Sequence, residues 1–314
     1  MIGAAVDVGS NSVHLLVAEI TSDGLRYLRD ESVLLGLGDV VDRLGSLPAD
    51  SRQQVVDALE LLRRAAETEG AQMVTFVGTE PLRRAVNAAE LTMLVDHRFE
   101  IPLHVLSERA EAELTYLGVT NGLPVSEPLL VVDIGGGSTE VIVAIPGQNL
   151  RLHSLPTGSA RLSVGSLRND PPTPNEYDRL RAGAGSFVQA LARPVGIARA
   201  VFAGGTATNL VRLAPLSRAG LEIAHGLLTS LSETELVQRY GINSRRARQL
   251  PAGAALVDAL LDHFGLPEAE VSQASLREGA ILAAAVLGDD WPSGLPTLIS
   301  TRSAVASNGR PPET

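Results

Sequence analysis

A pair of similar segments constrains the fold of this chain more than any other feature. Residues 5–18 read AVDVGSNSVHLLVA and residues 131–144 read VVDIGGGSTEVIVA. Each segment is an apolar run, a small polar turn and a second apolar run rich in β-branched residues, which predicts strand, turn, strand. A constant offset of 126 residues aligns Asp7 with Asp133, Gly9 with Gly135, Ser12 with Ser138 and Ala18 with Ala144. Such a long repeat predicts a chain built from two related halves.

The rest of the chain alternates predicted strands with predicted helices. Residues 25–33 and 73–78 have the pattern of strands, and residues 53–68 carry apolar side chains at helical spacing. After the second repeat, a strand at residues 199–203 leads into the turn at residues 204–206. This alternation predicts an α/β fold.

Composition excludes several classes of protein. The chain has 314 residues, enough for two domains, and its content of 45% apolar and 20% charged residues is typical of a soluble globular protein. It has no cysteine, which excludes disulfides, thiolate metal sites and a cysteine nucleophile. The N-terminus lacks a signal-peptide pattern, and the apolar run at residues 281–287 is too short to span a bilayer, so we expect a cytoplasmic protein. A net charge of −10 disfavours nucleic-acid binding, so an anionic substrate needs a local binding site.

Three turns are candidate phosphate-binding sites. We name residues 7–12 the first turn, residues 133–138 the second turn and residues 204–206 the third turn. Glycine-rich turns and helix N-termini bind phosphate through N–H groups that point toward it. Ordinary helix capping explains the third turn equally well when it is considered alone. The duplication of the first two turns favours phosphate binding for all three.

The strand after the second turn carries a candidate metal ligand. Alternate residues of a strand share a face, so Ser138 and Glu140 point the same way, about 6.5 Å apart. Ser12 and His14 occupy the same positions in the first repeat. A carboxylate that faces a phosphate turn is repulsive unless a cation lies between them. Asp133 and Glu140 could supply oxygen ligands to Mg²⁺, which proteins bind through few carboxylates plus water and phosphate oxygens; the alternative for Glu140 is a solvated strand position.

A predicted helix over residues 107–118 carries two candidates for a general base. Ser107 is of the residue type that caps helix N-termini. Glu111 and Glu113 lie beside the two borders of the apolar stripe of this helix, about 160° apart. A carboxylate at such a border, just before the second turn, could act as a general base. Helical geometry does not choose between the two, and taken alone it favours a surface position for both.

Eight motifs together resemble one protein family. They follow in the order seen in the exopolyphosphatase and guanosine pentaphosphate phosphohydrolase family, within the actin, heat-shock chaperone and sugar kinase superfamily, and the resemblance covers about residues 1–288. The motifs are residues 7–19 (DVGSNSVHLLVAE), 79–88 (TEPLRRAVNA), 106–119 (LSERAEAELTYLGV), 133–141 (DIGGGSTEV), 158–162 (GSARL), 204–210 (GGTATNL), 225–229 (HGLLT) and 275–282 (SLREGAIL).

The resemblance implies two domains of duplicated actin-like, or ribonuclease H-like, α/β topology around an interdomain cleft. Residues 1–118 match domain I, to which a helix at about 276–288 returns, and residues 119–275 match domain II. We expect residues 289–314 to form a disordered tail. The longer family members carry an extra C-terminal domain resembling HD-type phosphohydrolases, whereas this chain is similar to the short form. With the net charge of −10, this leads us to expect short polyphosphate rather than processive action on long chains.

The resemblance also implies roles for single residues. Glu111, rather than Glu113, matches the catalytic glutamate that positions or deprotonates the attacking water. Asp133 and Glu140 match the positions associated with a divalent metal, Mg²⁺ or Mn²⁺. His14 is a specificity candidate that does not decide the substrate, because some family members acting on guanosine pentaphosphate have Arg there while His occurs with both activities. The predicted phosphate contacts are Gly9, Ser10, Asn11, Ser12, Arg83, Gly136, Gly137 and Ser138, together with Gly205 and Thr206 of the third turn.

The leading hypothesis is a metal-dependent phosphohydrolase that cleaves the terminal phosphoanhydride of inorganic polyphosphate. A second hypothesis is removal of the 5′ γ-phosphate of guanosine pentaphosphate, a reaction of the stringent response. A third, of another class, is a sensor that binds ppGpp-like nucleotides with little turnover, which the presence of Glu111, Asp133 and Glu140 disfavours. A sugar kinase is disfavoured because the candidate base precedes the second turn. We expect no nucleic-acid or membrane partner. The sequence does not decide whether the protein forms a homodimer.

Overall fold

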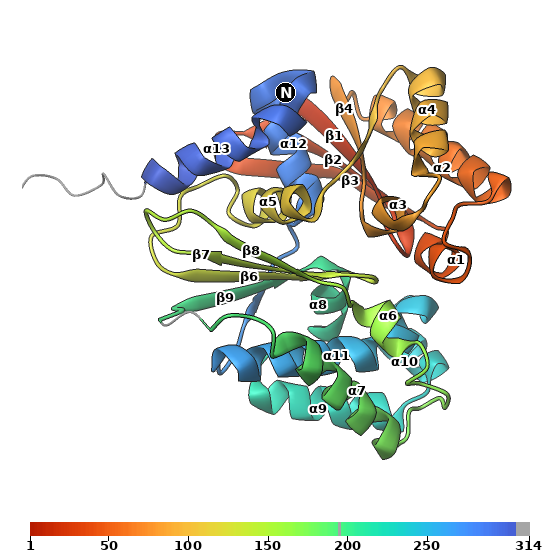
Figure 1. Cartoon of the computed structure of the whole chain (residues 1–314), viewed down its shortest axis with the longest axis vertical. Coiled ribbons are helices and arrows are strands. Elements are labelled where there is room, and N and C mark those ends of the chain that lie inside the picture. Colours follow the sequence, from red (N-terminus) through yellow and green to blue (C-terminus); the bar gives the residue numbers. More distant parts are fainter. Residues whose placement is uncertain (194–195, 306–314) are drawn as a thin grey trace, which may run out of the picture. The chain divides into compact units, whose positions relative to one another are not determined.

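The computed structural model describes residues 1–193 and 196–305 of the chain (Figure 1). The chain divides into two compact units. Unit 1 comprises Met1–Pro124 and the described residues from Ala274 onward, and unit 2 comprises Val125–Gln273. The domain boundaries expected from the resemblance, after residues 118 and 275, lie near the ends of these units.

Unit 1 is built on a five-stranded sheet with the order β3-β2-β1-β4-β5. Its strands are β1 (Ile2–Val8), β2 (Ser12–Thr21), β3 (Gly24–Leu34), β4 (Met73–Gly78) and β5 (Leu103–Val105). Its helices are α1 (Leu37–Leu44), α2 (Ala49–Thr68), α3 (Glu80–Arg84), α4 (Ala88–Phe99), α5 (Glu108–Val119) and α12 (Leu276–Leu287), the 3₁₀ helix η1 (Gly288–Asp290) and α13 (Trp291–Val305). The helices α2 and α12 both pack on this sheet.

Unit 2 repeats this plan with a sheet of the order β10-β9-β6-β7-β8. Its strands are β6 (Leu129–Ile134), β7 (Thr139–Ala144), β8 (Arg151–Leu155), β9 (Arg199–Ala203) and β10 (Glu270–Val271). Its helices are α6 (Ser159–Ser163), α7 (Pro174–Val188), α8 (Gly204–Leu210), α9 (Arg218–Ser230), α10 (Glu233–Tyr240) and α11 (Ser244–Phe264). Within the described residues of both units, no helix combines the length and the apolar content needed to cross a bilayer.

The two sheets confirm the predicted α/β fold and its duplication. In each unit a central antiparallel hairpin continues into a third antiparallel strand, while the fourth and fifth strands run parallel to the first. Across the hairpin of unit 1, Asp7 pairs with His14, and across that of unit 2, Asp133 pairs with Glu140. The offset of 126 residues in the sequence is therefore preserved in the strand register.

The central strands place their polar residues away from the apolar cores. Val6 of β1 lies in the core of unit 1, and Val132 of β6 lies at the equivalent position in the core of unit 2. Successive side chains of a strand point to opposite faces of the sheet. Asp7 and Asp133, which follow these valines, therefore project from the opposite face at the carboxyl end of their strands.

The helices α5 and α12 of unit 1 cross with their backbones in contact. A Cβ atom added to Gly118 would lie 1.9 Å from the Ser275 carbonyl oxygen, and one added to Gly279 would lie 1.9 Å from the Leu114 carbonyl oxygen. Real Cβ atoms are never this close to backbone, so both positions require glycine. The crossing fixes α5, the helix that carries Glu111, against the C-terminal part of the chain.

The prediction of a disordered tail is wrong for residues 289–305, which form η1 and α13. Trp291, Leu295 and Ile299 recur every four residues and are buried. The indole Nε1 of Trp291 also donates a hydrogen bond to Thr75 Oγ1 at 3.1 Å. The proline and glycine content of this segment suggested a loop, but the spacing of its apolar residues outweighs that signal. Residues 306–314, the rest of the predicted tail, lie outside the described residues.

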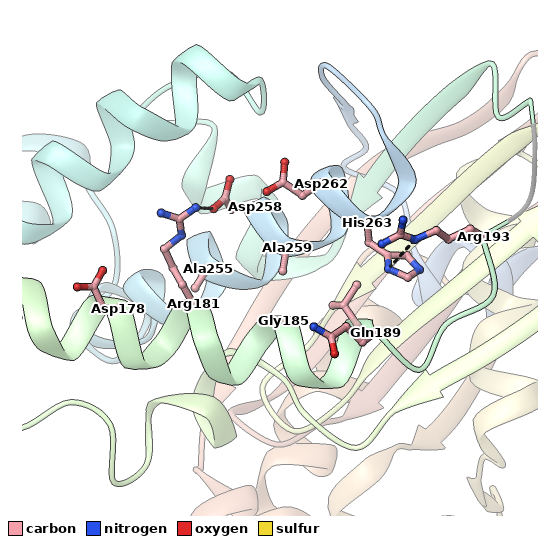
Figure 2. Close-up of a pocket in the computed structure, with 11 residues that line it drawn as sticks. Asp178, Arg181, Gly185, Gln189, Arg193, Ala255, Asp258, Ala259, Asp262 and His263 are labelled. Carbon is pink, nitrogen blue, oxygen red and sulfur yellow. Dashed lines mark hydrogen bonds and ion pairs between the residues drawn. The ribbon is translucent and has the colours of Figure 1, made fainter.

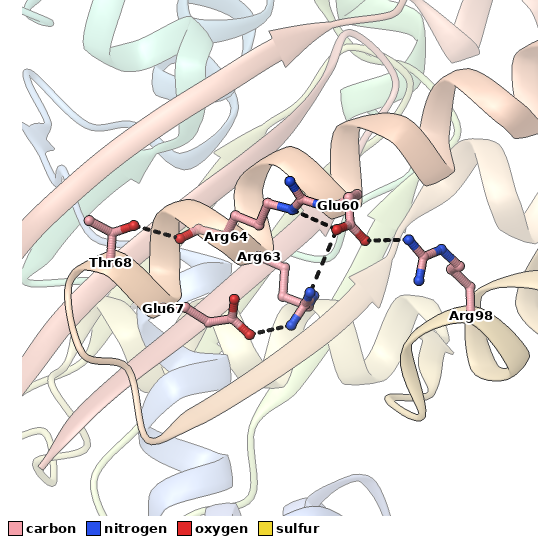
Figure 3. A network of polar contacts seen from close by, with 6 residues as sticks. All are labelled: Glu60, Arg63, Arg64, Glu67, Thr68 and Arg98. Atoms are coloured by element: carbon pink, nitrogen blue, oxygen red, sulfur yellow. Dashed lines mark hydrogen bonds and ion pairs between the residues drawn. The ribbon is translucent and has the colours of Figure 1, made fainter.

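An ion-pair network joins α2 to α4 on the surface of unit 1 (Figure 3). The Glu60 carboxylate lies 2.7 Å from Arg64 Nε and 3.2 Å from Arg98 Nη2. Arg63 bridges Glu60 and Glu67 along α2. The hydrogen bond from Arg64 lowers the pKa of Glu60. Ion pairs near the surface contribute little to stability, so the network is an accessory to the apolar packing of the two helices.

A buried glutamate of α7 in unit 2 holds the preceding loop in place through hydrogen bonds. The Glu176 carboxylate accepts hydrogen bonds from the backbone N–H groups of Thr173 at 2.9 Å and Arg168 at 2.8 Å, and from Asn169 Nδ2 at 3.1 Å. The Thr173 hydroxyl accepts from the Glu176 N–H, which completes a capping box. These hydrogen bonds, that from the Thr173 backbone first, lower the pKa of Glu176 to about 2.

We expect Glu176→Gln to destabilise the protein at neutral pH and much less in acid. The native carboxyl has a pKa below its ordinary value, so its stabilising contribution is complete above that ordinary value and is lost as the pH falls toward about 2. Thermal denaturation at pH 7 should show a Tm lower by about 2–4 °C, and this difference should shrink at pH 3. Glu222→Gln, at an exposed position of α9, is the control. A Tm difference that stays constant from pH 7 to pH 3 would contradict this account.

Candidate functional site

The first turn is held in place through its carbonyl groups. The Gly9 N–H donates to the Ser12 carbonyl at 3.0 Å and closes the hairpin. The Asn11 carbonyl accepts from the N–H groups of Leu35 at 3.1 Å and Gly36 at 2.9 Å, just before α1. The carbonyl groups of this turn therefore accept hydrogen bonds from neighbouring backbone N–H groups.

The second turn is held in the same manner. The Gly135 N–H donates to the Ser138 carbonyl at 3.0 Å, as in the first turn. The Gly135 and Gly136 carbonyls accept from backbone N–H groups at the start of α6 at 2.9 and 3.0 Å, and the Gly137 carbonyl accepts from Arg161 Nη1 at 2.6 Å. Within the described residues, no backbone hydrogen bond has the N–H of Gly136 or Gly137 as its donor. These N–H groups are main-chain donors of the kind that bind anions.

The third turn lies against Asp133 at the ends of the neighbouring strands β6 and β9. Gly204 has a φ of +80°, and a Cβ atom there would lie 2.1 Å from Asp133 Oδ1. At Gly205 a Cβ atom would lie 2.5 Å from Arg246 Nη2. The glycines thus permit both Asp133 and Arg246 to approach the backbone of this turn closely.

Arg246 of α11 is a candidate site residue that the sequence analysis missed. Burial lowers the pKa of its guanidinium, while the nearby Asp133 opposes that shift. Its Nη1 is buried and has no hydrogen-bond partner among the described residues. A buried donor left unpaired costs about 1–3 kcal/mol, which favours a ligand that accepts from it. Three arginines stand close together in residues 245–248, and only the fold shows which one reaches the turn.

Thr206 lies beneath the second turn with its hydroxyl directed inward. Its side chain is buried, and Oγ1 donates to Ser159 Oγ at 3.2 Å. The Ser159 hydroxyl donates in turn to the Gly135 carbonyl at 3.2 Å. The Thr206 side chain is therefore positioned to support the second turn from below.

Asp133 and Glu140 form a pair of carboxylates that suits a divalent cation. They are direct cross-strand neighbours, and such neighbours have Cβ atoms about 4.5–5.5 Å apart. Glu140 is 2% exposed, and its Oε1 accepts the Ser154 hydroxyl at 3.1 Å. The charge of Arg246 acts on Asp133, and a divalent cation between the two carboxylates would offset their mutual repulsion further. The described residues contain no group of three or more His, Asp or Glu that could hold a metal, so water and phosphate oxygens would have to complete the coordination.

Glu111 of α5 is buried next to an arginine. Its carboxylate forms an ion pair with Arg83 Nη1, and the same nitrogen donates to the Leu106 carbonyl at 3.1 Å. Burial raises the pKa of Glu111, and the Arg83 charge opposes this shift. Ser107 caps α5 as predicted, accepting the Ala110 N–H at 3.1 Å. The surface position that the helix pattern suggested for Glu111 is wrong.

Glu113 is also buried, contrary to the helix pattern. It forms an ion pair with Arg109 Nε at 2.8 Å, one turn earlier on α5. Burial raises the pKa of Glu113, and Arg109 opposes the shift. Because α5 packs on its neighbours along both borders of its apolar stripe, burial alone does not distinguish the two glutamates. Their partners do, since Glu111 contacts Arg83, which the sequence analysis also selected.

His14 joins the first turn through Ser12. Ser12 Oγ lies 2.5 Å from His14 Nε2, as expected for residues that share one face of a strand. Across the hairpin His14 pairs with Asp7. The specificity candidate therefore contacts a predicted phosphate-binding residue.

Two hollows are lined by residues outside the second and third turns. One of about 430 Å³ lies between α7 and α11 (Figure 2), and two of the charged side chains that line it, Arg181 and Asp258, form an ion pair at 2.8 Å. The other, of about 540 Å³, lies in unit 1 and is lined by Arg83, Leu106 and Ser107 together with apolar residues of α3 and α4. Only the second of these hollows includes a predicted site residue.

Comparison with known proteins decides the family. The model of the Ppx/GppA phosphatase family matches residues 16–286. The chain belongs to this family. It is similar to a Haemophilus influenzae protein assigned as an exopolyphosphatase, with 28% identity over 88% of this chain and 90% of that protein. An uncharacterized protein of Streptomyces coelicolor is 31% identical over 92% of this chain and 91% of its own length.

Solved structures agree with this assignment. The Aquifex aeolicus member of the Ppx/GppA family has 27% identity and a TM-score of 0.78, covering 92% of this chain and 99% of that one. An exopolyphosphatase from Cytophaga hutchinsonii shares the fold with a TM-score of 0.79 at 23% identity, over 92% of this chain and 98% of that one. The resemblance predicted from the motifs and the actin-like fold are confirmed. As a Ppx/GppA phosphatase, this chain is an enzyme of the class that hydrolyses phosphoanhydride bonds.

We expect Gly205→Ala to lower activity by displacing Arg246. The new methyl group would collide with the end of the Arg246 side chain, which can move aside at little cost to the fold. Loss of a charged hydrogen bond to substrate should lower kcat/KM about 10- to 100-fold in a phosphate-release assay, with the Tm nearly unchanged. Gly185→Ala, in α7 where a Cβ atom meets open space, is the matched control. If Arg246→Ala retains the parent kcat/KM, Arg246 has no part in the site.

Proposed function

We propose that this enzyme is an exopolyphosphatase that hydrolyses the terminal phosphoanhydride of inorganic polyphosphate, preferably of short chains, with Mg²⁺ or Mn²⁺ as cofactor. The observation that carries the proposal is the equivalence of the first and second turns. Each unit holds one turn whose carbonyls accept from its own protein neighbours. One such turn in each unit suits a substrate made of identical phosphate groups.

Glu111 is the proposed general base. It positions a water molecule and accepts one of its protons while the water oxygen bonds to the terminal phosphorus. The bridging oxygen leaves with the shortened chain, and orthophosphate is the second product. Burial, which raises the pKa of Glu111, brings this carboxylate nearer to neutral pH, where a base accepts a proton most effectively. Arg83 orients it through their ion pair.

The proposed phosphate contacts are the backbone of the first and second turns and the third turn at Gly205. Arg246 adds a buried guanidinium donor next to the third turn. Asp133 and Glu140 would hold the divalent cation, which neutralises charge that develops on the phosphate oxygens. A cytoplasmic location and a homodimer stay predictions.

The hollow beside Arg83 favours guanosine pentaphosphate as the second candidate substrate. Val86 is 87% exposed and Val105 is 37% exposed along this hollow, and both lie near Arg83. Polyphosphate has no apolar part that these side chains could contact, whereas a nucleoside has apolar faces. Removal of the 5′ γ-phosphate would use the same base and the same turns.

We expect Glu111→Gln to lower kcat by about 10²- to 10⁴-fold, the usual contribution of a general base. Phosphate release should be measured with short polyphosphate, long polyphosphate and guanosine pentaphosphate in parallel. Glu222→Gln, at an exposed position of α9 and not among the proposed contacts, is the control. A Glu111→Gln variant with near-parent kcat on every substrate would remove Glu111 from the mechanism. A parent that binds the nucleotide but releases no phosphate would favour the sensor hypothesis.

Removal of divalent cations should abolish turnover, and the carboxylate pair should set the metal requirement. Asp133→Asn and Glu140→Gln keep the shape of each side chain and remove the negative charge. We expect both variants to need a higher Mg²⁺ concentration for half-maximal activity. Calorimetric titration of Mg²⁺ into the protein with bound phosphate should show the same weakening. Full activity in EDTA would end the metal assignment.

A further inference from the structure

The mechanism proposed above gives no role to Glu80, a buried carboxylate of unit 1 that contacts the first turn. Glu80, the first residue of α3, is 5% exposed. Its Oε2 accepts the Ser10 hydroxyl at 3.0 Å, and its Oε1 accepts from Arg84 Nη1 at 2.8 Å. Arg84 also pairs with Asp42 of α1 at 2.5 Å. The short helix α3 therefore places a carboxylate in direct contact with the first turn.

The sheet of unit 1 fixes this contact. The strands β1 and β4 are parallel neighbours, with Val8 beside Gly78 at their carboxyl ends. The Thr79 N–H extends the pairing by donating to the Val8 carbonyl at 3.2 Å. The chain that leaves β4 therefore runs beside the chain that leaves β1, and Glu80 has to lie next to the first turn.

The hydrogen bond to Glu80 determines where the Ser10 proton points. An ionised carboxylate can only accept, and a serine hydroxyl has a single proton. While that proton is donated to Glu80, Ser10 Oγ offers only lone pairs to a ligand. Phosphate oxygens are acceptors as well, so this hydroxyl cannot donate to them.

The second turn, which is the other proposed phosphate site, has no hydroxyl at this position. With the offset of 126 residues, Gly136 corresponds to Ser10 and has no side chain. Both turns share the Gly N–H to Ser carbonyl hydrogen bond and the clamped carbonyls. The Ser10 hydroxyl is therefore an addition that is specific to the unit that contains Glu111.

We propose that Glu80 is a positioning residue that holds the Ser10 hydroxyl as an acceptor, so that Ser10 Oγ receives a hydrogen bond from the attacking water. The inference rests on the proposed phosphoanhydride hydrolysis. Water carries two protons, of which Glu111 accepts one as the oxygen bonds to phosphorus. The other proton, directed at Ser10 Oγ, stays on the oxygen and becomes part of the orthophosphate product. Two acceptors fix the orientation of the water, whereas one leaves it free to rotate.

The electrostatics of the site are consistent with this arrangement. After burial, which is the largest effect, the charges of Glu80 and Glu108 also raise the pKa of Glu111, and Arg83 opposes them. Glu80 and Glu111 therefore lie within electrostatic reach of each other. The ion pairs of the neighbouring residues Arg83 and Arg84 keep the two carboxylates apart, because Arg83 binds Glu111 and Arg84 binds Glu80.

The test compares Ser10→Ala, Glu80→Gln and the double variant in steady-state assays. Glu80→Gln keeps the shape of the side chain, but its amide can donate to Ser10 Oγ and so occupy the lone pairs. Each single variant should lower kcat about 10- to 100-fold, with KM changed by less than about twofold. The double variant should be no slower than the slower single variant, because both act through one hydroxyl. Asp42→Asn, which alters the same ion-pair chain without touching the first turn, should keep the parent kcat.

Binding measurements separate positioning from phosphate contact. In the Glu111→Gln background, calorimetric titration of tripolyphosphate should give a Kd that Ser10→Ala changes by less than about twofold. A weakened Kd, or a raised KM with parent kcat, would show that Ser10 binds phosphate and would overturn the inference. Effects of Ser10→Ala and Glu80→Gln that multiply in the double variant would overturn it as well.

Three further outcomes are distinguishable. If Glu80→Gln fails to fold, which its Tm shows, Ser10→Ala alone decides through the split between kcat and KM. If the parent releases no phosphate from any substrate, the proposed function fails. If the parent is active, Glu111→Gln is inactive and Ser10→Ala keeps the parent kcat, only the role of Glu80 and Ser10 is refuted.

Discussion

The carbonyl groups of the first and second turns accept hydrogen bonds from neighbouring backbone N–H groups. The candidate site in each unit depends on these hydrogen bonds. A carbonyl oxygen that faced a bound phosphate would repel it, so a turn binds phosphate only if its carbonyls are held elsewhere. In unit 1 the backbone at the start of α1 accomplishes this, and in unit 2 the start of α6 does so. Gly158 permits the close approach in unit 2, since a Cβ atom there would lie 2.5 Å from the Gly135 carbonyl oxygen.

Strand register then places the side chains around the turns. The pairing that sets Asp133 opposite Glu140 sets Asp7 opposite His14 in the other unit. One framework therefore presents two acidic side chains in one half and an acid with an imidazole in the other. The duplication has retained the geometry of the backbone while the chemistry of the two halves has diverged.

The sequence predicted those features of the protein that depend on a few neighbouring residues. The repeat, the strands around each turn and the Ser107 cap could be predicted because alternation, turn residues and capping act over a few neighbours. The burial of Glu111 and Glu113 could not, because it depends on how α12 crosses α5. Arg246 stands among several arginines of one helix start, and only the packing of α11 on the third turn selects it. The helix α13 was missed because its prolines and glycines hid the spacing of Trp291, Leu295 and Ile299.

The backbone crossing of α5 and α12 has a consequence for the order in which the protein is made. The helix that carries Glu111 is synthesised before the middle of the chain. The surface that fixes it, around Gly279, belongs to α12, which follows all of unit 2 in the sequence. A nascent chain can complete the sheet of unit 2 while α5 still lacks this support. A ribosome that stalls before α12 therefore leaves a product that contains the first and second turns but in which α5, with Glu111, is not held in place.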